Sequence, residues 1–329
     1  MGQPRIPPTP AGTSLAGKTV IVTGGNAGLG LEAARQYLIL GAARLILACR
    51  SVARAKEAVT TLRADPEVAK HNPGAVTDVF ELDLDDYQSG LRFAQKVKNE
   101  VPELDILMNN GGIATIKYET SKTGHERHMQ VNCYTHILVT LELFPLLRAT
   151  AAKRGSPTHV SFTGSGMHVN KVAFPTSLTP FPAADKALMP ILDDRATSTN
   201  MGRYADSKLA VAACVSKLGQ IAPGEVIVNH LCPGLVQTGL DKNLPFLLKT
   251  TMVLMRKTMG RTVEEGARTL VYASAVAGPE SNGKFIQHNA VAEGNTWLNE
   301  SDGKKFTERL WKETVQDVAA VDPALASFA

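Results

Sequence analysis

The segment KTVIVTGGNAGLG, residues 18–30, decides the fold class. A short β-branched run, 18–24, ends in glycine and leads into 28–40, where apolar residues have helical spacing. Glycines at this junction allow a tight turn, and the free N–H groups of a helix N-terminus attract a pyrophosphate. A glycine-rich loop between a strand and a helix predicts a dinucleotide-binding unit, with a plain turn as the alternative.

The same alternation of strand and helix continues along the chain. Further strands are predicted at 44–48, 75–83, 104–110, 158–164, 225–234 and 283–287, and further helices at 51–63, 86–99, 122–150 and 203–220. Thr262 and Glu265 have the spacing of a capping box that opens one more helix. We therefore predict an α/β fold with a Rossmann-type, doubly wound parallel sheet in a single domain, 15–329, preceded by a flexible proline-rich extension, 1–14.

Two segments interrupt the alternation, proline-rich 166–202 and apolar 239–259. Each follows the C-terminal end of a strand, the edge at which ligands of open α/β sheets bind. We interpret both as walls of a substrate pocket rather than as surface insertions. For 239–259, a membrane-touching amphipathic helix is a further alternative. The predicted substrate contacts are Met167, His168, Leu244, Phe246 and Leu247.

Composition limits the expected partners. The 329 residues are 44% hydrophobic and 20% charged with a net charge of +4, and no basic run alternates with aromatic residues, so nucleic acid is not an expected partner. No apolar run is long enough to cross a bilayer, and the first residues lack the apolar core of a signal peptide. We expect a cytoplasmic protein with a small-molecule substrate, and we leave homo-oligomer formation open.

Cysteine and histidine spacing gives no indication of a metal site. The cysteines lie in apolar runs and lack CxxC spacing, which indicates buried reduced thiols: Cys49, Cys133, Cys214 and Cys232. His125 and His128 are three positions apart, but no third ligand follows at a known spacing. We predict that these histidines belong to a solvated helix face and that no metal is bound.

Three further features point to chemistry. Tyr204 and Lys208 are four residues apart on a predicted helix, so they share one face. A lysine beside a tyrosine lowers the pKa of the phenol and makes the tyrosine a proton donor near neutrality. Ser165 offers a hydroxyl at a strand end, and Asn132 places an amide in an apolar stripe. Arg50 stands where such units usually carry an acid, so it could bind the 2′-phosphate of NADP, although it could also be a surface arginine.

Together these motifs resemble the compact, one-domain short-chain dehydrogenase/reductase family, from residue 15 to about 318. Thr23, Gly24, Gly28 and Gly30 match its TGxxxGxG loop, Asn109-Asn110-Gly111-Gly112 its Asn-Asn-Ala-Gly, and Pro233-Gly234 its Pro-Gly. ACR at 48–50 and EEGARTLVYAS at 264–274 are most similar to retinol dehydrogenases and fungal ketoreductases.

The resemblance implies NADP(H) as cofactor and a set of site residues. The implied catalytic residues are Asn132, which would hold a water, Ser165, which would orient the substrate, Tyr204, the proton donor, and Lys208, which would also bind the nicotinamide ribose. The implied cofactor contacts are Gly24, Asn26, Gly28, Leu29, Gly30, Arg50, Asp83, Leu84, Asn110, Tyr204, Lys208, Pro233, Gly234, Val236 and Thr238. Ser165 and Tyr204 are 39 positions apart (204 − 165), which is long for compact members, so Ser161 and Thr163 remain substitutes for Ser165.

The leading hypothesis is an NADPH-dependent ketoreductase that transfers a hydride to a bulky, largely apolar ketone or aldehyde, or runs the reverse alcohol oxidation, in secondary metabolism. One alternative is a non-catalytic NADP-binding regulator, which would not need the complete Asn-Ser-Tyr-Lys set. Another is a lyase or epimerase on the same fold, although extended epimerases have the loop spacing TGxxGxxG.

Overall fold

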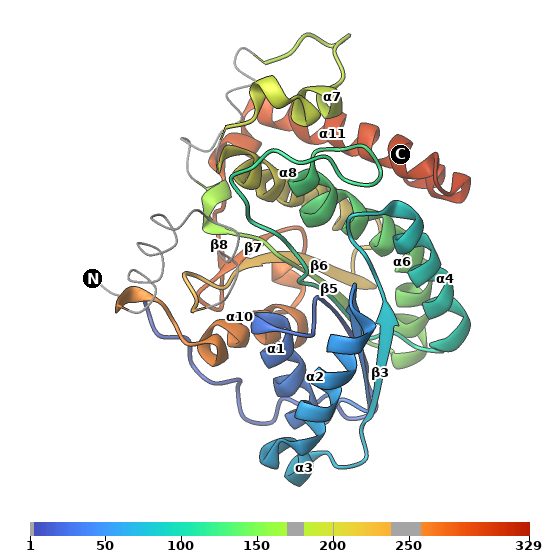
Figure 1. Ribbon diagram of the computed structural model, residues 1–329, viewed down its shortest axis with the longest axis vertical. Helices are drawn as coiled ribbons and strands as arrows, with labels where there is room; N and C mark the ends of the chain where they lie inside the picture. The colour runs from blue at the N-terminus through green and yellow to red at the C-terminus, as the bar shows by residue number, and fades with distance from the viewer. Residues whose placement is uncertain (1–2, 170–180, 200, 238–257) are drawn as a thin grey trace.

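The computed structural model describes residues 3–169, 181–199, 201–237 and 258–329 (Figure 1). Within these residues one sheet has the strand order β3-β2-β1-β4-β5-β6-β7-β8. The pairs from β3 to β7 are parallel, and β8 is antiparallel to β7. The strands are β1 (Thr19–Thr23), β2 (Arg44–Cys49), β3 (Val76–Glu81), β4 (Ile106–Asn109), β5 (Thr158–Thr163), β6 (Val226–Cys232), β7 (Phe285–Gln287) and β8 (Ala290–Ala292). This confirms the predicted α/β class and doubly wound sheet.

Helices cover both faces of the sheet (Figure 1). Side chains alternate along β1, so Val20 and Val22 join one core while Ile21 joins the other. The first core packs under α1 (Gly28–Ile39), α2 (Val52–Ala64) and α10 (Val263–Ala275). The second lies under α4 (Tyr87–Glu100), α6 (Thr135–Arg154) and α8 (Gly202–Leu218), and α11 (Ser301–Ala319) contacts α8 and the short α7 (Leu188–Asp193). None of the described helices is both long and apolar enough to span a membrane.

The long helix predicted at 122–150 differs from the observed one. Thr120 pairs with Glu126 in an isolated bridge, and Glu126 then caps the short α5 (Arg127–Met129). A π-helical turn, Gln130–Tyr134, connects α5 to α6. The helical run therefore starts five residues later than predicted (127 − 122) because the chain first turns back on itself. The short helix α3 (Pro66–His71) and strand β8 were not predicted.

Residues 3–6, within the extension predicted at 1–14, make specific contacts with the domain. The side chain of Ile6 is 1% exposed, and its backbone N–H donates to Glu265 Oε1 at 2.7 Å. The hydroxyl of Thr262 accepts from Glu265 N at 3.1 Å, which confirms the predicted helix cap. In the described structure the Glu265 carboxylate binds Ile6 instead of completing the capping box, because the N-terminal stretch lies against α10.

Candidate active site

The glycine loop between β1 and α1 requires glycine both for its backbone conformation and for its close packing. Gly24 and Gly28 have φ values of 64° and 55°, in the left-handed region that favours glycine. A Cβ on Gly30 would lie 2.5 Å from Asn110 Nδ2 and 2.6 Å from the oxygen of Gly24. The side chain of Ala27, which precedes α1, makes no capping hydrogen bond. The first N–H groups of α1 are thus suited to binding an anion.

Thr23 and Asn110 connect the ends of β1 and β4 below this loop. Thr23 Oγ1 accepts from the backbone N–H groups of Asn110 and Gly111, both at 2.9 Å, and lies 3.0 Å from His136 Nε2. Asn110 Nδ2 donates to the oxygen of Thr23 at 3.0 Å. The side chain of Asn110 is therefore used to hold the loop, in addition to its implied position beside the cofactor.

Arg50 lies at the end of β2, beside the glycine loop. Its side chain is exposed and makes no hydrogen bond or ion pair with the part of the chain that the structure describes. Burial raises the pKa of the preceding thiol, Cys49, to about 11, although the N–H groups of Asn26 and Gly25 donate to its sulfur. Because Cys49 contacts the loop directly, Arg50 is available at the loop edge for an anionic group.

Asp83 and Leu84 follow β3, as predicted, and each has a contact. Asp83 Oδ2 lies 2.8 Å from Lys122 Nζ, so an ion pair already engages this carboxylate. A Cβ on Gly111 would lie 2.5 Å from Leu84 Cδ1. The end of the Leu84 side chain therefore occupies the space that an alanine side chain at position 111 would need.

Tyr204 and Lys208 share one face of α8, as their spacing predicts. Lys208 is 5% exposed, its Nζ donates to the oxygen of Thr163 at 2.7 Å, and it lies 5.7 Å from the centroid of the Tyr204 ring. Burial lowers the pKa of Lys208 to about 8. A cation at this distance favours the phenolate form of the tyrosine.

Asn132 lies in the π-helical turn and connects the loop after β4 to α8. Its Oδ1 accepts from Ile113 N at 2.8 Å, and its Nδ2 donates to the oxygen of Ile113 at 3.1 Å and to Ser207 Oγ at 3.0 Å. Ser207 lies on α8 between the tyrosine and the lysine. The amide therefore has a structural role in addition to the water contact that the resemblance implies.

Ser165 differs from its two substitutes, Ser161 and Thr163, in its contacts. Its Oγ accepts from Met167 N at 3.2 Å and caps the 3₁₀ turn Gly166–His168, which contacts α8. Ser161 is fully buried and donates to Asn229 Oδ1 at 2.7 Å, while the backbone of Thr163 binds the lysine. The half-buried Ser165 therefore stands directly before a turn that contacts the helix of Tyr204, and its contact with the substrate stays a prediction.

His168 packs in the interior, although the sequence predicts a substrate contact. Its ring centroid lies 5.1 Å from that of His230 and 4.6 Å from that of Phe285, and burial lowers its pKa. Asn295 Nδ2 donates to its backbone oxygen. The structure therefore gives His168 a packing role, while the neighbouring Met167 is half-buried.

A cleft of about 750 Å³ lies beside His168, but it is lined by Ala212, Ser216 and Phe285 rather than by Tyr204 or Lys208. Residues 212 and 216 lie farther along α8 than the lysine, so we do not assign this cleft to the substrate. The other predicted contacts, Thr238, Leu244, Phe246 and Leu247, fall outside the described residues.

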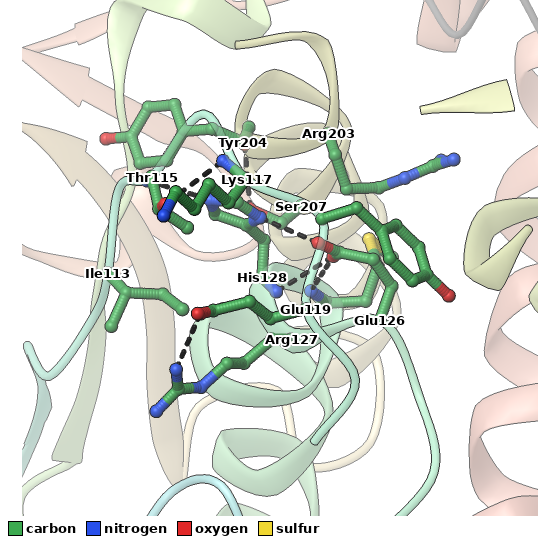
Figure 2. Close-up of polar contacts among 12 residues, drawn as sticks. Ile113, Thr115, Lys117, Glu119, Glu126, Arg127, His128, Arg203, Tyr204 and Ser207 are labelled. Atoms are coloured by element: carbon green, nitrogen blue, oxygen red, sulfur yellow. Dashed lines mark hydrogen bonds and ion pairs between the residues drawn. The ribbon is translucent and has the colours of Figure 1, made fainter. Parts of the chain in front are cut away.

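His128 and Glu126 form a buried pair beside Tyr204, which sequence reasoning missed (Figure 2). His128 Nε2 accepts from Thr115 N at 3.1 Å, so its Nδ1 donates to Glu126 Oε1 at 2.8 Å. The imidazole stands edge-on to the Tyr204 ring, with centroids 6.3 Å apart. The pair thus fixes one side of the tyrosine ring.

The prediction of a solvated helix face for His125 and His128 is wrong, because both bind acidic side chains. His125 Nδ1 lies 2.7 Å from Asp193 Oδ2 and its Nε2 lies 3.1 Å from Asp317 Oδ2. The described residues contain no group of three or more His, Cys, Asp or Glu side chains suited to a metal. All four cysteines are buried and unpaired.

The loop after β6 connects the Ser165 turn to the glycine loop. Gly234 has a φ of 84°, and Cys232 Sγ accepts from Gly166 N at 3.1 Å and from Gly234 N at 3.4 Å. At the other end of the loop, Val236 and Leu29 both pack against Gly266 of α10. A Cβ on Gly266 would lie 2.7 Å from Val236 Cγ2 and 2.9 Å from Leu29 Cδ2. The predicted cofactor contacts from β1, β4 and β6 therefore converge at one edge of the sheet.

Comparisons with known proteins agree with this arrangement. A profile of the short chain dehydrogenase family matches residues 18–174. The short chain dehydrogenase sor7 of Hypocrea jecorina is 60% identical over 292 residues, which cover 88% of this chain and 80% of that protein. The short chain dehydrogenase macD of Penicillium terrestre is 36% identical over 97% and 96% of the two chains. The RhlG/NADP active-site complex of Pseudomonas aeruginosa superposes with a TM-score of 0.64 at 22% identity, over 85% of this chain and 97% of that chain, and supports the fold.

Proposed function

The chain belongs to the short-chain dehydrogenase family, and on this premise we propose that it is an NADPH-dependent reductase of a bulky, largely apolar ketone or aldehyde. The family acts on CH–OH or C=O groups with a nicotinamide cofactor. The cofactor preference, the direction and the substrate class are our proposals. Several of the curated relatives are fungal, and a role in secondary metabolism is part of the same proposal.

The observation that carries the proposal is the placement of Lys208 beside Tyr204. The buried ammonium, 5.7 Å from the ring centroid, lets the tyrosine exchange a proton near neutral pH. When bound, the nicotinamide would supply the hydride. Tyr204 would donate a proton to the carbonyl oxygen, Ser165 would hold that oxygen, and Lys208 would lower the pKa of the tyrosine and bind the nicotinamide ribose.

Arg50 supports the preference for NADP. It is exposed at the end of β2, next to a residue that contacts the glycine loop, and residues 48–51 contain no acid that would repel a phosphate. A guanidinium can form two parallel hydrogen bonds with a phosphate group. The RhlG structure contains NADP, which is consistent with this cofactor on the shared fold.

A ketone panel and one substitution test the proposal. The unaltered protein should oxidise NADPH, followed at the nicotinamide absorbance band, with at least one bulky apolar ketone or aldehyde. Tyr204→Phe should keep NADPH binding and lose turnover by roughly 10²- to 10⁴-fold, because general-acid catalysis is removed. Tyr272→Phe, half-buried on α10, is the matched control and should leave turnover unchanged.

Two outcomes would contradict the proposal. Near-normal turnover in Tyr204→Phe would remove this tyrosine from the mechanism. NADPH binding without turnover of any panel member would favour the alternative of a cofactor-binding regulator.

A further inference from the structure

The amide of Gln3 binds backbone groups far away in the chain. Its Oε1 accepts from Leu235 N at 2.8 Å, and its Nε2 donates to the oxygens of Leu235 at 2.8 Å and Met259 at 2.9 Å. Both amide hydrogens and the amide oxygen are thus used. The primary amide of a glutamine or asparagine is the side-chain group that offers two N–H donors together with a carbonyl acceptor.

The two backbone stretches that Gln3 joins are already paired with each other. Arg261 N donates to the oxygen of Leu235 at 2.9 Å, and Gln237 N donates to the oxygen of Arg261 at 3.1 Å. Leu235 belongs to the loop after β6, whereas Met259 leads into α10. Gln3 therefore binds across the junction at which these two stretches meet.

A buried guanidinium continues the same contact. Arg261 is 4% exposed, and its Nη2 and Nε donate to the oxygen of Pro4 at 2.7 and 3.2 Å. Its Nη1 donates to the oxygen of Pro233 at 2.9 Å. One side chain thus connects the N-terminal stretch to the first residue of the loop after β6.

Gly234 shows how closely these groups approach the loop. Its φ of 84° lies in the left-handed region, and a Cβ there would overlap Gln3 Oε1 and Arg261 Nη1. The same loop lies beside the Ser165 turn through Cys232 and beside Leu29 of the glycine loop through Val236. The conformation of the loop after β6 therefore affects both the Ser165 turn and the glycine loop.

We propose that the N-terminal arm, residues 3–6, positions the loop Pro233–Val236 for cofactor binding, with Gln3 as the positioning residue. The inference rests on the proposed function and on the cofactor contacts that the resemblance implies for Pro233, Gly234 and Val236 of this loop. Without the arm, the loop occupies its binding conformation for a smaller fraction of the time, and the apparent dissociation constant rises by the inverse of that fraction. Turnover at saturating NADPH should change much less, because the contacts of residues 3–6 go to the loop after β6 and to the start of α10 rather than to α8.

Two altered chains and one control test this role. Gln3→Ala removes the three amide hydrogen bonds, and deletion of residues 1–6 removes the whole arm. Arg5→Ala is the control, because Arg5 is exposed in the same arm and makes no hydrogen bond or ion pair with the described chain. We expect the dissociation constant for NADPH, from fluorescence titration, to rise roughly 3- to 10-fold for Gln3→Ala and at least as much for the deletion. The kcat should stay within about twofold, and Arg5→Ala should match the unaltered protein.

Hydrogen exchange gives a readout independent of activity. The Leu235 amide, which donates to Gln3, should exchange faster in Gln3→Ala but not in Arg5→Ala. Unchanged NADPH affinity in both altered chains, or an unchanged exchange rate of the Leu235 amide, would overturn the positioning role alone. Failure of the unaltered protein to bind NADPH would overturn the proposed function, and this inference with it.

Discussion

Lys208→Met should shift the pH dependence of turnover. The substitution removes a buried charge 5.7 Å from the Tyr204 ring centroid and keeps a side chain of similar length. Taking this centroid distance as the separation of two unit charges, an effective dielectric constant of about 20 gives an interaction of roughly 3 kcal/mol, which corresponds to about 2 pKa units. A cation stabilises the phenolate, so its loss raises the pKa of Tyr204 by about this amount.

The oxidation of an alcohol product with NADP⁺ is the suitable assay, because this direction needs the phenolate. At saturating cofactor, the pH at which kcat reaches half its maximum should rise by about 2 units, and turnover at pH 7 should fall roughly 100-fold. Burial lowers the pKa of Lys208 to about 8, so the advantage of the unaltered protein should shrink above pH 8, where this lysine loses its own charge.

Lys217→Met is the control on the same helix, because Lys217 Nζ lies 2.9 Å from the Glu308 carboxylate and does not contact the tyrosine. Its pH profile should match that of the unaltered protein. An equal loss of kcat at every pH in Lys208→Met, with no shift of the profile, would show that the lysine acts only through cofactor binding or folding.

Two further substitutions test the cofactor preference and an ion-pair network. Arg50→Ala should weaken NADPH binding by roughly 10- to 150-fold and leave NADH binding almost unchanged. Both dissociation constants are measured by titration, with Arg92→Ala on α4 as the control. An equal effect on both cofactors would make Arg50 only a surface residue. Although burial opposes its charge, Asp193 and Asp317 raise the pKa of His125 to about 9. Because this is above the unfolded value of 6.5, its contribution to the unfolding free energy is complete below about pH 6.5 and is lost as the pH rises through 9. The unfolding free energy, measured with denaturant between pH 6.5 and 9, should therefore change less with pH in His125→Gln than in the unaltered protein, by no more than about 3 kcal/mol. Equal pH dependence of the unfolding free energy in the two proteins would contradict the role of His125.

The strand–helix order and the central motifs could be predicted because their signals are local. Strands inside a parallel sheet are covered on both faces, so 45–48 and 226–228 are continuous apolar runs without alternation. The glycine loop needs its residue types at fixed positions. Tyr204 and Lys208 meet because helix geometry alone places residues four apart on one face.

The remaining features depend on contacts between distant residues. The amide of Gln3 binds Leu235, 232 positions away, and nothing in a proline-rich stretch predicts that partner. His128 is buried because Thr115 and Tyr204 come to it from other elements. Strand β8 follows a turn in which two non-glycine residues, His288 and Asn289, have φ values of 55° and 56°. Without glycine there, the hairpin lacks its usual sequence signal.

Leu84 and Gly111 are in contact, although Leu84 follows β3 and Gly111 follows β4. A side chain at 111 would overlap the end of the leucine, so the residues tolerated at one position depend on the residue at the other. The two positions therefore form a single unit for protein engineering. An Asn-Asn-Ala-Gly sequence in this chain should therefore displace the end of the Leu84 side chain, and a smaller residue at position 84 should remove the need for that shift.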